Sequence, residues 1–407
     1  MHKEYSKSGL VAVTNALESS GAFDLREAFG AMTPELGGGG MAQGYNTEGD
    51  VLTQTIDGRD LNELWNEIQQ GLMAWNAGRT RLVQALTFPV TSPIEEVPQL
   101  SLADFEEASE YGEPIGIRGG DYFSLGYDFR WYDIAVRYTW KYLAEASAAQ
   151  VATLANQVLE ADNRLVFNKI MKAIFNNVNR TANIRGNNYT VYPFYNNDGT
   201  VPPQYKNTTF LSTHQHYVTS GAATIDSGDL DQMEVLLKEH GYGRQAGSTL
   251  ILLCNPAQTA TIRNFRVATG SSYDFIPGSG QPPWLLPTNT GGVVIPQGAG
   301  VPPTVNGLDV MGRYGSWLIV EEDYIPAGYI LGFATGGDNN AVNPVGIREH
   351  QNTALRGLRL VKGREPDYPL IDSFYNRGFG TGIRQRGAGA VMQITASGTY
   401  TIPTAYV

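Results

Sequence analysis

Residues 123–138 read FSLGYDFRWYDIAVRY. Apolar side chains alternate with small or polar ones from Phe123 to Trp131, and the apolar set then changes register at Ile134. Because residues two apart share a face of a sheet, this pattern predicts one long strand with a bulge or bend near Tyr132–Asp133. A strand of about 16 residues would span roughly 53 Å, whereas most strands have about 5–6 residues. We therefore expect a ribbon that projects from the body of the protein.

The segment before this strand, residues 88–120, is rich in proline and in acidic side chains. Its prolines are at positions 89, 93, 98 and 114, and its acidic residues are Glu95, Glu96, Asp104, Glu106, Glu107, Glu110 and Glu113. Such a cluster of carboxylates could form an active site. Its spread along a proline-rich loop instead predicts a solvated or docking surface.

The segment after the strand predicts a long helix at residues 142–177. Neither glycine nor proline interrupts it, and Leu143, Val151, Leu154 and Val158 lie at helical spacing. At about 1.5 Å per residue the helix would be roughly 50 Å long. Because its apolar stripe is not a sustained heptad, we expect a spine and not a coiled coil.

Both ends of the chain carry clear local signals. Residues 1–60 include the run Gly37–Gly40, which predicts a flexible arm, and a helix is expected between its cap Asp60 and the stop signal Gly78. Further helices are expected at residues 229–240 and after Asn255–Pro256, and a proline- and glycine-rich loop at 276–304. Strands are expected at residues 249–254, 307–313, 317–321, 329–333, 358–361, 371–376 and 386–395. This mixture predicts an α+β fold.

The composition favours a chain that buries much of its surface against partners. Charged residues make up 17% of the 407 residues, against about 25% in typical soluble proteins, while Gly (47), Pro (21) and Tyr (22) are abundant. A β-rich monomer would share part of this pattern. The net charge of −11 is uneven, because residues 1–113 are acidic and residues 345–407 are basic. The two ends could attract each other between copies, or they could be two solvated faces of one monomer.

The sequence carries no sign of secretion or of a membrane span. The single cysteine, Cys254, excludes an intrachain disulfide and fits a reducing cytoplasm. The polar start, Met1–Ser8, is not followed by a long apolar run, so no signal peptide is expected. No stretch approaches about 18 consecutive apolar residues.

None of the motifs predicts an enzyme, a cofactor or a metal site. His214 and His216 could bind a metal, but no further ligand is close to them in sequence. The three acids Asp226, Asp229 and Asp231 are better explained by helix capping than by a calcium loop. The glycines at 378, 380 and 382 lack the context of a nucleotide loop and indicate close backbone packing. Cys254 lies in an apolar run, as inert core cysteines do.

Two stretches resemble a known family. Residues 372–395, DSFYNRGFGTGIRQRGAGAVMQIT, and residues 317–329, WLIVEEDYIPAGY, are similar to segments of major capsid proteins from phages of actinobacteria. The order of parts along the chain also resembles the Hong Kong 97-type capsid fold of tailed bacteriophages. That resemblance implies an N-terminal arm at 1–60, a helix and strand at 61–90, an extended loop at 91–132, a peripheral domain at 133–213 and 350–407, and an axial domain at 214–349.

The resemblance implies a structural protein of the virion, made and assembled in the host cytoplasm. Hexamers and pentamers of the chain would form an icosahedral shell around double-stranded DNA without sequence-specific binding. A separate scaffolding protein and a portal would be partners, a decoration protein could bind the shell, and no membrane would be involved. Some family members cross-link a lysine of the extended loop to a neighbour. Here no lysine occurs between Lys7 and Lys141, so we expect no such link.

Within this interpretation, acidic side chains of the extended loop would dock on basic side chains of an adjacent copy. The expected negative side consists of Glu95, Glu96, Glu106, Glu107 and Glu110, and the positive side of Arg164, Lys169 and Lys172 or of Arg384 and Arg386. Three alternatives remain open at this point. They are an encapsulin-type nanocompartment shell, a β-rich phage tail or glycan-binding module, and an enzyme.

Overall fold

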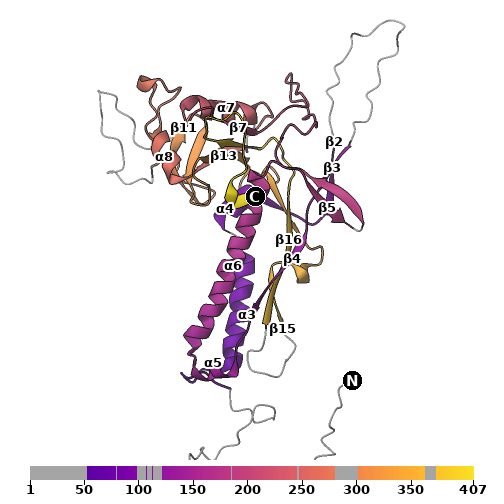
Figure 1. The fold of residues 1–407 in the computed structure, drawn as a ribbon, viewed down its shortest axis with the longest axis vertical. Coiled ribbons are helices and arrows are strands. Elements are labelled where there is room, and N and C mark those ends of the chain that lie inside the picture. Colours follow the sequence, from indigo (N-terminus) through magenta and orange to yellow (C-terminus); the bar gives the residue numbers. More distant parts are fainter. Residues whose placement is uncertain are drawn as a thin grey trace, which may run out of the picture. The chain divides into compact units, whose positions relative to one another are not determined.

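The computed structural model describes residues 53–78, 80–98, 107, 112, 122–184, 186–244, 247–279, 301–362 and 373–407. The expected arm therefore lies outside the described residues except for 53–60, as do the tip of the extended loop and most of the loop at 276–304. Residues 54–407 form one unit, shown in Figure 1.

The structure describes six α-helices, and in all but one of them a side chain caps the first turn. They are α3 (Leu61–Ala77), α4 (Arg81–Leu86), α5 (Trp140–Glu145), α6 (Ala148–Phe175), α7 (Ser227–Lys238) and α8 (Pro256–Ile262), with 3₁₀ turns at Val267–Thr269, Thr353–Leu355 and Thr404–Tyr406. The side chains of Asp60, Asp226 and Asn255 each accept a hydrogen bond from a backbone N–H of the first turn. The capping predicted for these three residues is confirmed. Among the described residues, none of the helices combines the length and apolarity that a membrane crossing requires.

The larger sheet has eight strands around the apolar strand β8. In order they are β10 (Thr304–Val305), β11 (Leu308–Tyr314), β12 (Trp317–Glu321), β8 (Thr249–Cys254), β13 (Tyr329–Thr335), β17 (Gly389–Gln393) and β7 (Tyr217–Thr219), with β9 (Ile276–Pro277) paired to β11. Successive residues of β8 enter different cores because their side chains alternate. Leu250, Leu252 and Cys254 pack in the cluster that contains α7, and Ile251 and Leu253 in the cluster that contains α6.

The second sheet is built around one long strand, β16 (Ser373–Ile383). Its other strands are β1 (Thr87–Val90), β14 (Val345–Glu349), β15 (Leu358–Lys362) and β4 (Arg130–Val136). Strand β16 pairs antiparallel with β14, β15 and β4. Figure 1 shows this sheet beside α6, with α3 next to the helix. Arg377 of β16 forms an ion pair with the buried Asp162 of α6 (2.5 Å), and Trp75 of α3 donates to the same carboxylate (2.9 Å).

Two hairpins complete the described fold. They are the ribbon β2–β3 (Ile94–Pro98 and Tyr122–Gly126) and the hairpin β5–β6 (Arg180–Ile184 and Asn187–Val191). The ribbon packs against the hairpin. The ring centroid of Phe123 lies 4.6 Å from that of Tyr192, the residue that follows β6. The ribbon is therefore anchored on the body of the protein.

The prediction of a single long strand at 123–138 is wrong in one respect. It is two strands, β3 and β4, in two different sheets, and the break lies at Tyr127–Phe129 and not at Tyr132–Asp133. The break occurs where Asp128 leaves both ladders and accepts a hydrogen bond from the backbone N–H of Thr381. Alternation alone could not reveal this, because it continues through the break.

The long helix expected at 142–177 is also divided. Helix α5 ends at Glu145, and α6 starts after Ser147, which forms a capping box with Gln150. The sequence Ser147-Ala-Ala-Gln150 is a start signal for a helix, and it stops α5 without any glycine or proline. The 28 residues of α6 still form a spine of about 42 Å.

The glycines of β16 permit unusually close packing. A Cβ atom added at Gly378 would lie 2.5 Å from the ring of Trp131, one at Gly382 2.6 Å from the ring of Tyr127, and one at Gly380 only 1.5 Å from the backbone oxygen of Asp128. The predicted role of these glycines in close backbone packing is confirmed.

We expect Gly380→Ala to destabilise the protein strongly. The obstructing atom belongs to the backbone and cannot rotate away. Overpacking typically lowers the free energy of unfolding by about 1–3 kcal/mol, and we expect the loss here to reach or exceed the upper end of that range. Thermal unfolding of the purified protein measures the change. Gly398→Ala is the matched control, because a Cβ there meets nothing within 4 Å. Equal melting temperatures for the two variants would contradict the packing argument.

Candidate functional site

The acidic residues expected to dock on a neighbour fall into three groups. Glu95 on β2 is already engaged within its own chain: it accepts a hydrogen bond from the Tyr127 hydroxyl (2.5 Å) and lies 3.5 Å from the guanidinium of Arg384. Glu96 and Glu107 are exposed. Glu106 and Glu110 lie outside the described residues. Among the acids expected to dock that the structure describes, Glu96 and Glu107 are therefore the two that present their charge to solvent.

The cations expected on the spine helix differ in their surroundings. Arg164 is exposed on α6. Lys169 lies over the ring of Tyr132 (5.2 Å to its centroid), and burial lowers the pKa of its ammonium group. Lys172 donates a hydrogen bond to the backbone oxygen of Val407 (2.5 Å). Arg164 is thus the member of this group that is most open to a partner.

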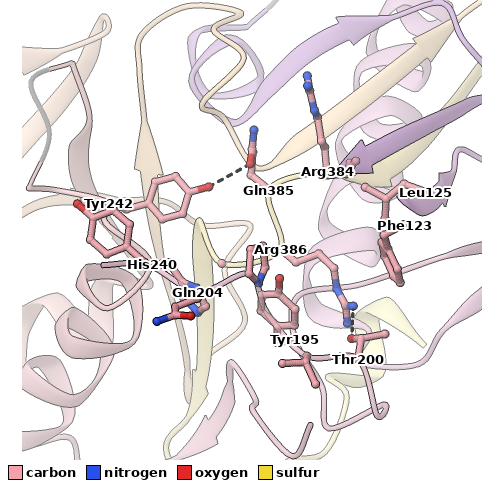
Figure 2. Close-up of a pocket in the computed structure, with 15 residues that line it drawn as sticks. Phe123, Leu125, Tyr195, Thr200, Gln204, His240, Tyr242, Arg384, Gln385 and Arg386 are labelled. Carbon is pink, nitrogen blue, oxygen red and sulfur yellow. Dashed lines mark hydrogen bonds between the residues drawn. The ribbon is translucent and has the colours of Figure 1, made fainter. Parts of the chain in front are cut away.

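Arg386 is an interior residue, not a surface cation. Its guanidinium forms an ion pair with Asp198 (2.9 Å) and donates to Thr200 (2.6 Å), the second bond being drawn in Figure 2. It also lies over the rings of Tyr192 and Tyr195, at 4.8 and 4.5 Å from their centroids. The basic tail of the chain therefore contributes part of its charge to the core, which sequence alone did not indicate.

Exposed apolar side chains mark surfaces suited to contact with other copies. Tyr122 on the ribbon is 69% exposed. Val361 and Phe374 face each other across β15 and β16 and are both exposed, as is Trp131 of β4 opposite Gly378. Large apolar side chains gathered on one face of a sheet are typical of an interaction surface.

A pocket of about 360 Å³ lies between the ribbon and loop residues that include the connection from β16 to β17 (Figure 2). Its lining includes Val97, Phe123 and Leu125 of the ribbon and, opposite them, Tyr195, His240, Tyr242, Arg384, Gln385, Arg386 and Gly387. The Tyr242 hydroxyl donates to Gln385 at one side of it (3.1 Å). His240 connects this pocket to a second group of polar side chains.

That second group is a cluster of three histidines and one glutamate. The Nε2 atoms of His214, His216 and His240 form a triangle with sides of 3.0, 3.0 and 3.1 Å. Glu239 Oε1 lies 3.3 Å from His214 Nε2, and the four ligand atoms are all within 4.8 Å of one another. In the sequence, His214 and His216 have no further ligand close to them. The structure supplies two, because the end of α7 meets the segment that precedes β7.

Burial favours the neutral form of the imidazoles in this cluster. Burial and the neighbouring His240 and His214 hold the pKa of His216 well below its ordinary value. Burial and the neighbouring His214 lower the pKa of His240 to about 3, and burial also lowers that of His214. Burial raises the pKa of the Glu239 carboxyl. The rings therefore hold nitrogen lone pairs in an enclosed space.

Comparison with solved structures finds similarity over almost the whole chain. A chain from Mycobacterium phage Patience is 46% identical, has a TM-score of 0.68, and the alignment covers 92% of this chain and 98% of that chain. A holo-encapsulin complex from Synechococcus elongatus PCC 7942 and the capsid of a native GTA particle are each 13% identical with a TM-score of 0.42. These alignments cover 79% and 92% of this chain and 90% and 99% of the other chains, respectively. No family model and no curated protein matches the chain.

We expect Asp198→Ala to destabilise the protein by about 3–5 kcal/mol, because it leaves the buried charge of Arg386 without its partner. The side chains of this pair are 3% (Arg386) and 8% (Asp198) exposed. Urea unfolding of the purified protein measures the loss. Glu67→Ala serves as the control, since its ion pair with Arg59 is exposed and should contribute about 0–1 kcal/mol. A loss no larger than that of the control would show that Arg386 does not depend on Asp198.

Proposed function

Because this chain belongs to the family of major capsid proteins of tailed bacteriophages with the Hong Kong 97-type fold, we propose that it assembles as hexamers and pentamers into an icosahedral head around double-stranded DNA. The observation that carries the proposal is the 46% identity to the chain from Mycobacterium phage Patience over 92% of this chain. The chain is a structural protein of the virion, and its self-assembly forms the shell.

The order of elements supports a division of labour within the subunit. We assign residues 91–132 to the extended loop, 133–213 and 350–407 to the peripheral domain and 214–349 to the axial domain, with 1–60 as an arm and 61–90 as the helix and strand that lead into the loop. Helix α6 and strands β4, β15 and β16 support the peripheral part, and α7, α8 and the strands around β8 support the axial part. Strand β17 of the C-terminal segment pairs with β13 and so joins the two parts.

The surfaces of the subunit suit repeated contact with copies of itself. The ribbon β2–β3 presents Tyr122 and Glu96 to solvent, and the outer face of β4, β15 and β16 presents Trp131, Val361 and Phe374. A heterologous contact repeated around a ring buries such surfaces in every copy and closes the assembly. Exposed apolar side chains that would be a liability in a monomer are covered in this way.

The proposed role requires no catalysis and no specific reading of DNA. A net charge of −11 opposes tight binding of the phosphate backbone, and a shell that encloses DNA without gripping it tolerates this charge. We propose that a separate scaffolding protein and a portal complete the particle, that its surface can accept a decoration protein, and that assembly takes place in the host cytoplasm. The proposed set of partners includes no membrane.

The direct test is electron microscopy of the purified full-length chain and of native particles. We expect closed shells with hexameric and pentameric units, and double-stranded DNA inside the native particles. A compact monomer or small trimer under all conditions would overturn the proposal. Protein cargo in place of DNA would identify a nanocompartment shell.

We expect reversal of loop acids to impair assembly while subunits still fold. The variant carries Glu96→Lys, Glu107→Lys and Glu110→Lys, which would repel basic side chains such as Arg164 on a neighbour. Each exposed pair contributes only about 0.2–1 kcal/mol, but every subunit both gives and receives the contact. The yield of shells in sedimentation assays at low and at 1 M salt is the measurement, since the Debye length falls to about 3 Å at 1 M.

The control for this experiment reverses three exposed acids away from the ribbon, Glu63, Glu160 and Asp309, and changes the net charge equally. Its assembly should be less affected than that of the loop variant. If the loop variant assembles with unchanged yield and salt dependence, apolar contacts alone hold the loop.

A further inference from the structure

Hydrogen bonding among His214, His216 and His240 cannot satisfy their nitrogens. Each Nε2 atom lies 3.0–3.1 Å from the other two. A ring nitrogen either carries a proton and donates, or carries a lone pair and accepts. Each of the three Nε2 atoms must be either a donor or an acceptor, so at least two of them are in the same state. Those two atoms face each other as two donors or as two lone pairs and cannot form a hydrogen bond. Protonating a ring adds a donor and leaves the conflict in place.

One of the three rings has a fixed orientation that aims a lone pair at the centre of the triangle. His216 Nδ1 lies 2.7 Å from the backbone oxygen of Gly389, and a carbonyl oxygen can only accept, so Nδ1 carries the proton. The Nε2 atom of His216 is therefore unprotonated. A histidine that donates from one nitrogen to a carbonyl and offers the other is the usual arrangement of a metal ligand.

The other members of the cluster are also held in place. The ring of His240 is stacked between Phe210 and Tyr195, at centroid distances of 4.3 and 5.5 Å. Glu239 Oε1 is buried, and among the described residues it accepts no hydrogen bond although it lies 3.3 Å from His214 Nε2. The carboxylate oxygen thus faces the same point as the three nitrogens and is not occupied by another donor.

We propose that His214, His216, His240 and Glu239 bind one divalent transition-metal ion, with zinc as the preferred ion, in every subunit. A tetrahedral ion bound at about 2.0–2.1 Å from its ligands holds them about 3.3 Å apart. The three nitrogens already have nearly this spacing, and a small movement of the glutamate completes the tetrahedron. The ion accepts all the lone pairs at once and so removes the conflict within the triangle.

The donor set identifies the class of ion and the kind of site. Imidazole and carboxylate ligands suit zinc and its neighbours in the first transition row, whereas magnesium and calcium prefer oxygen ligands alone. Four protein ligands leave no open position for a reacting water, so the site is structural. The charge of the ion is offset by Glu239, and that of the nearby Arg386 by Asp198.

The ion would fasten a long irregular segment to the larger sheet. Residues 192–216 join β6 to β7 with no helix and no strand beyond isolated bridges. Segments of this length without secondary structure are uncommon in compact domains. The ligands tie its end, at His214 and His216, to the end of α7 and, through Gly389, to β17. One of the ligands, His240, also lines the pocket of Figure 2.

The test uses the full-length chain, purified without an affinity tag of histidines and without chelators. We expect mass spectrometry of the metal content to find about one zinc ion per chain after dialysis against zinc. Removal of zinc with EDTA should lower the melting temperature by several degrees, and added zinc, but not magnesium, should restore it. Cobalt in place of zinc should give the intense visible absorption of a tetrahedral site, without a thiolate band because Cys254 is buried elsewhere.

Substitutions locate the ion. His214→Gln is the first variant, because this side chain is 14% exposed and its replacement should not prevent folding. It should lose the zinc and the response to EDTA, while the control His350→Gln, which lies outside the cluster, should keep both. Shell assembly is scored separately, so that loss of metal and loss of the capsid role are distinguishable.

Two results would overturn the proposal. One is wild-type protein that takes up no zinc and whose melting temperature does not respond to added zinc. The other is His214→Gln protein that retains zinc at the wild-type level.

Discussion

The approach of Asp128 to the glycine-rich strand β16 is the contact on which the rest of the structure depends. The backbone oxygen of Asp128 occupies the space that a side chain at Gly380 would take. At this point the chain leaves the ribbon β2–β3 and enters the sheet beside α6. Arg180 also forms an ion pair with Asp128 (2.5 Å), which brings the β5–β6 hairpin to the same place. The ribbon, the β5–β6 hairpin and the second sheet therefore meet at one junction.

Much of the fold could be predicted from the sequence, because many of its signals are local. Caps such as Asp60 and Asn255 act on the next turn of the chain, and the apolar run of β8 predicts burial wherever the strand lies. The break at Asp128 could not be predicted, since it depends on a distant partner strand. The hydrogen bond between Asp128 and Thr381 spans 253 positions of the sequence. The break before α6 had a local signal in Ser147, which the absence of glycine and proline obscured.

The candidate site was less accessible to sequence reasoning than the fold. His214 and His216 were visible as a pair, but His240 meets them only because α7 folds back over the sheet. The sequence pattern places Arg386 among several surface cations, yet the residue lies in the core with Asp198. In both cases the groups that meet in the interior come from different segments of the chain, so their spacing along the sequence does not reveal that they meet.

The long strand β16 also has a consequence for how the protein is synthesised. Strand β4 pairs with β16 across 243 positions of the sequence (Asp133 to Asn376). Strand β7 pairs with β17, which comes after β16 in the chain. Neither early strand has its partner until the ribosome has made nearly the whole chain. Contacts of such long range slow folding and delay it until translation ends. A chain that ended before β16 would lack strands of both sheets and could complete neither of them.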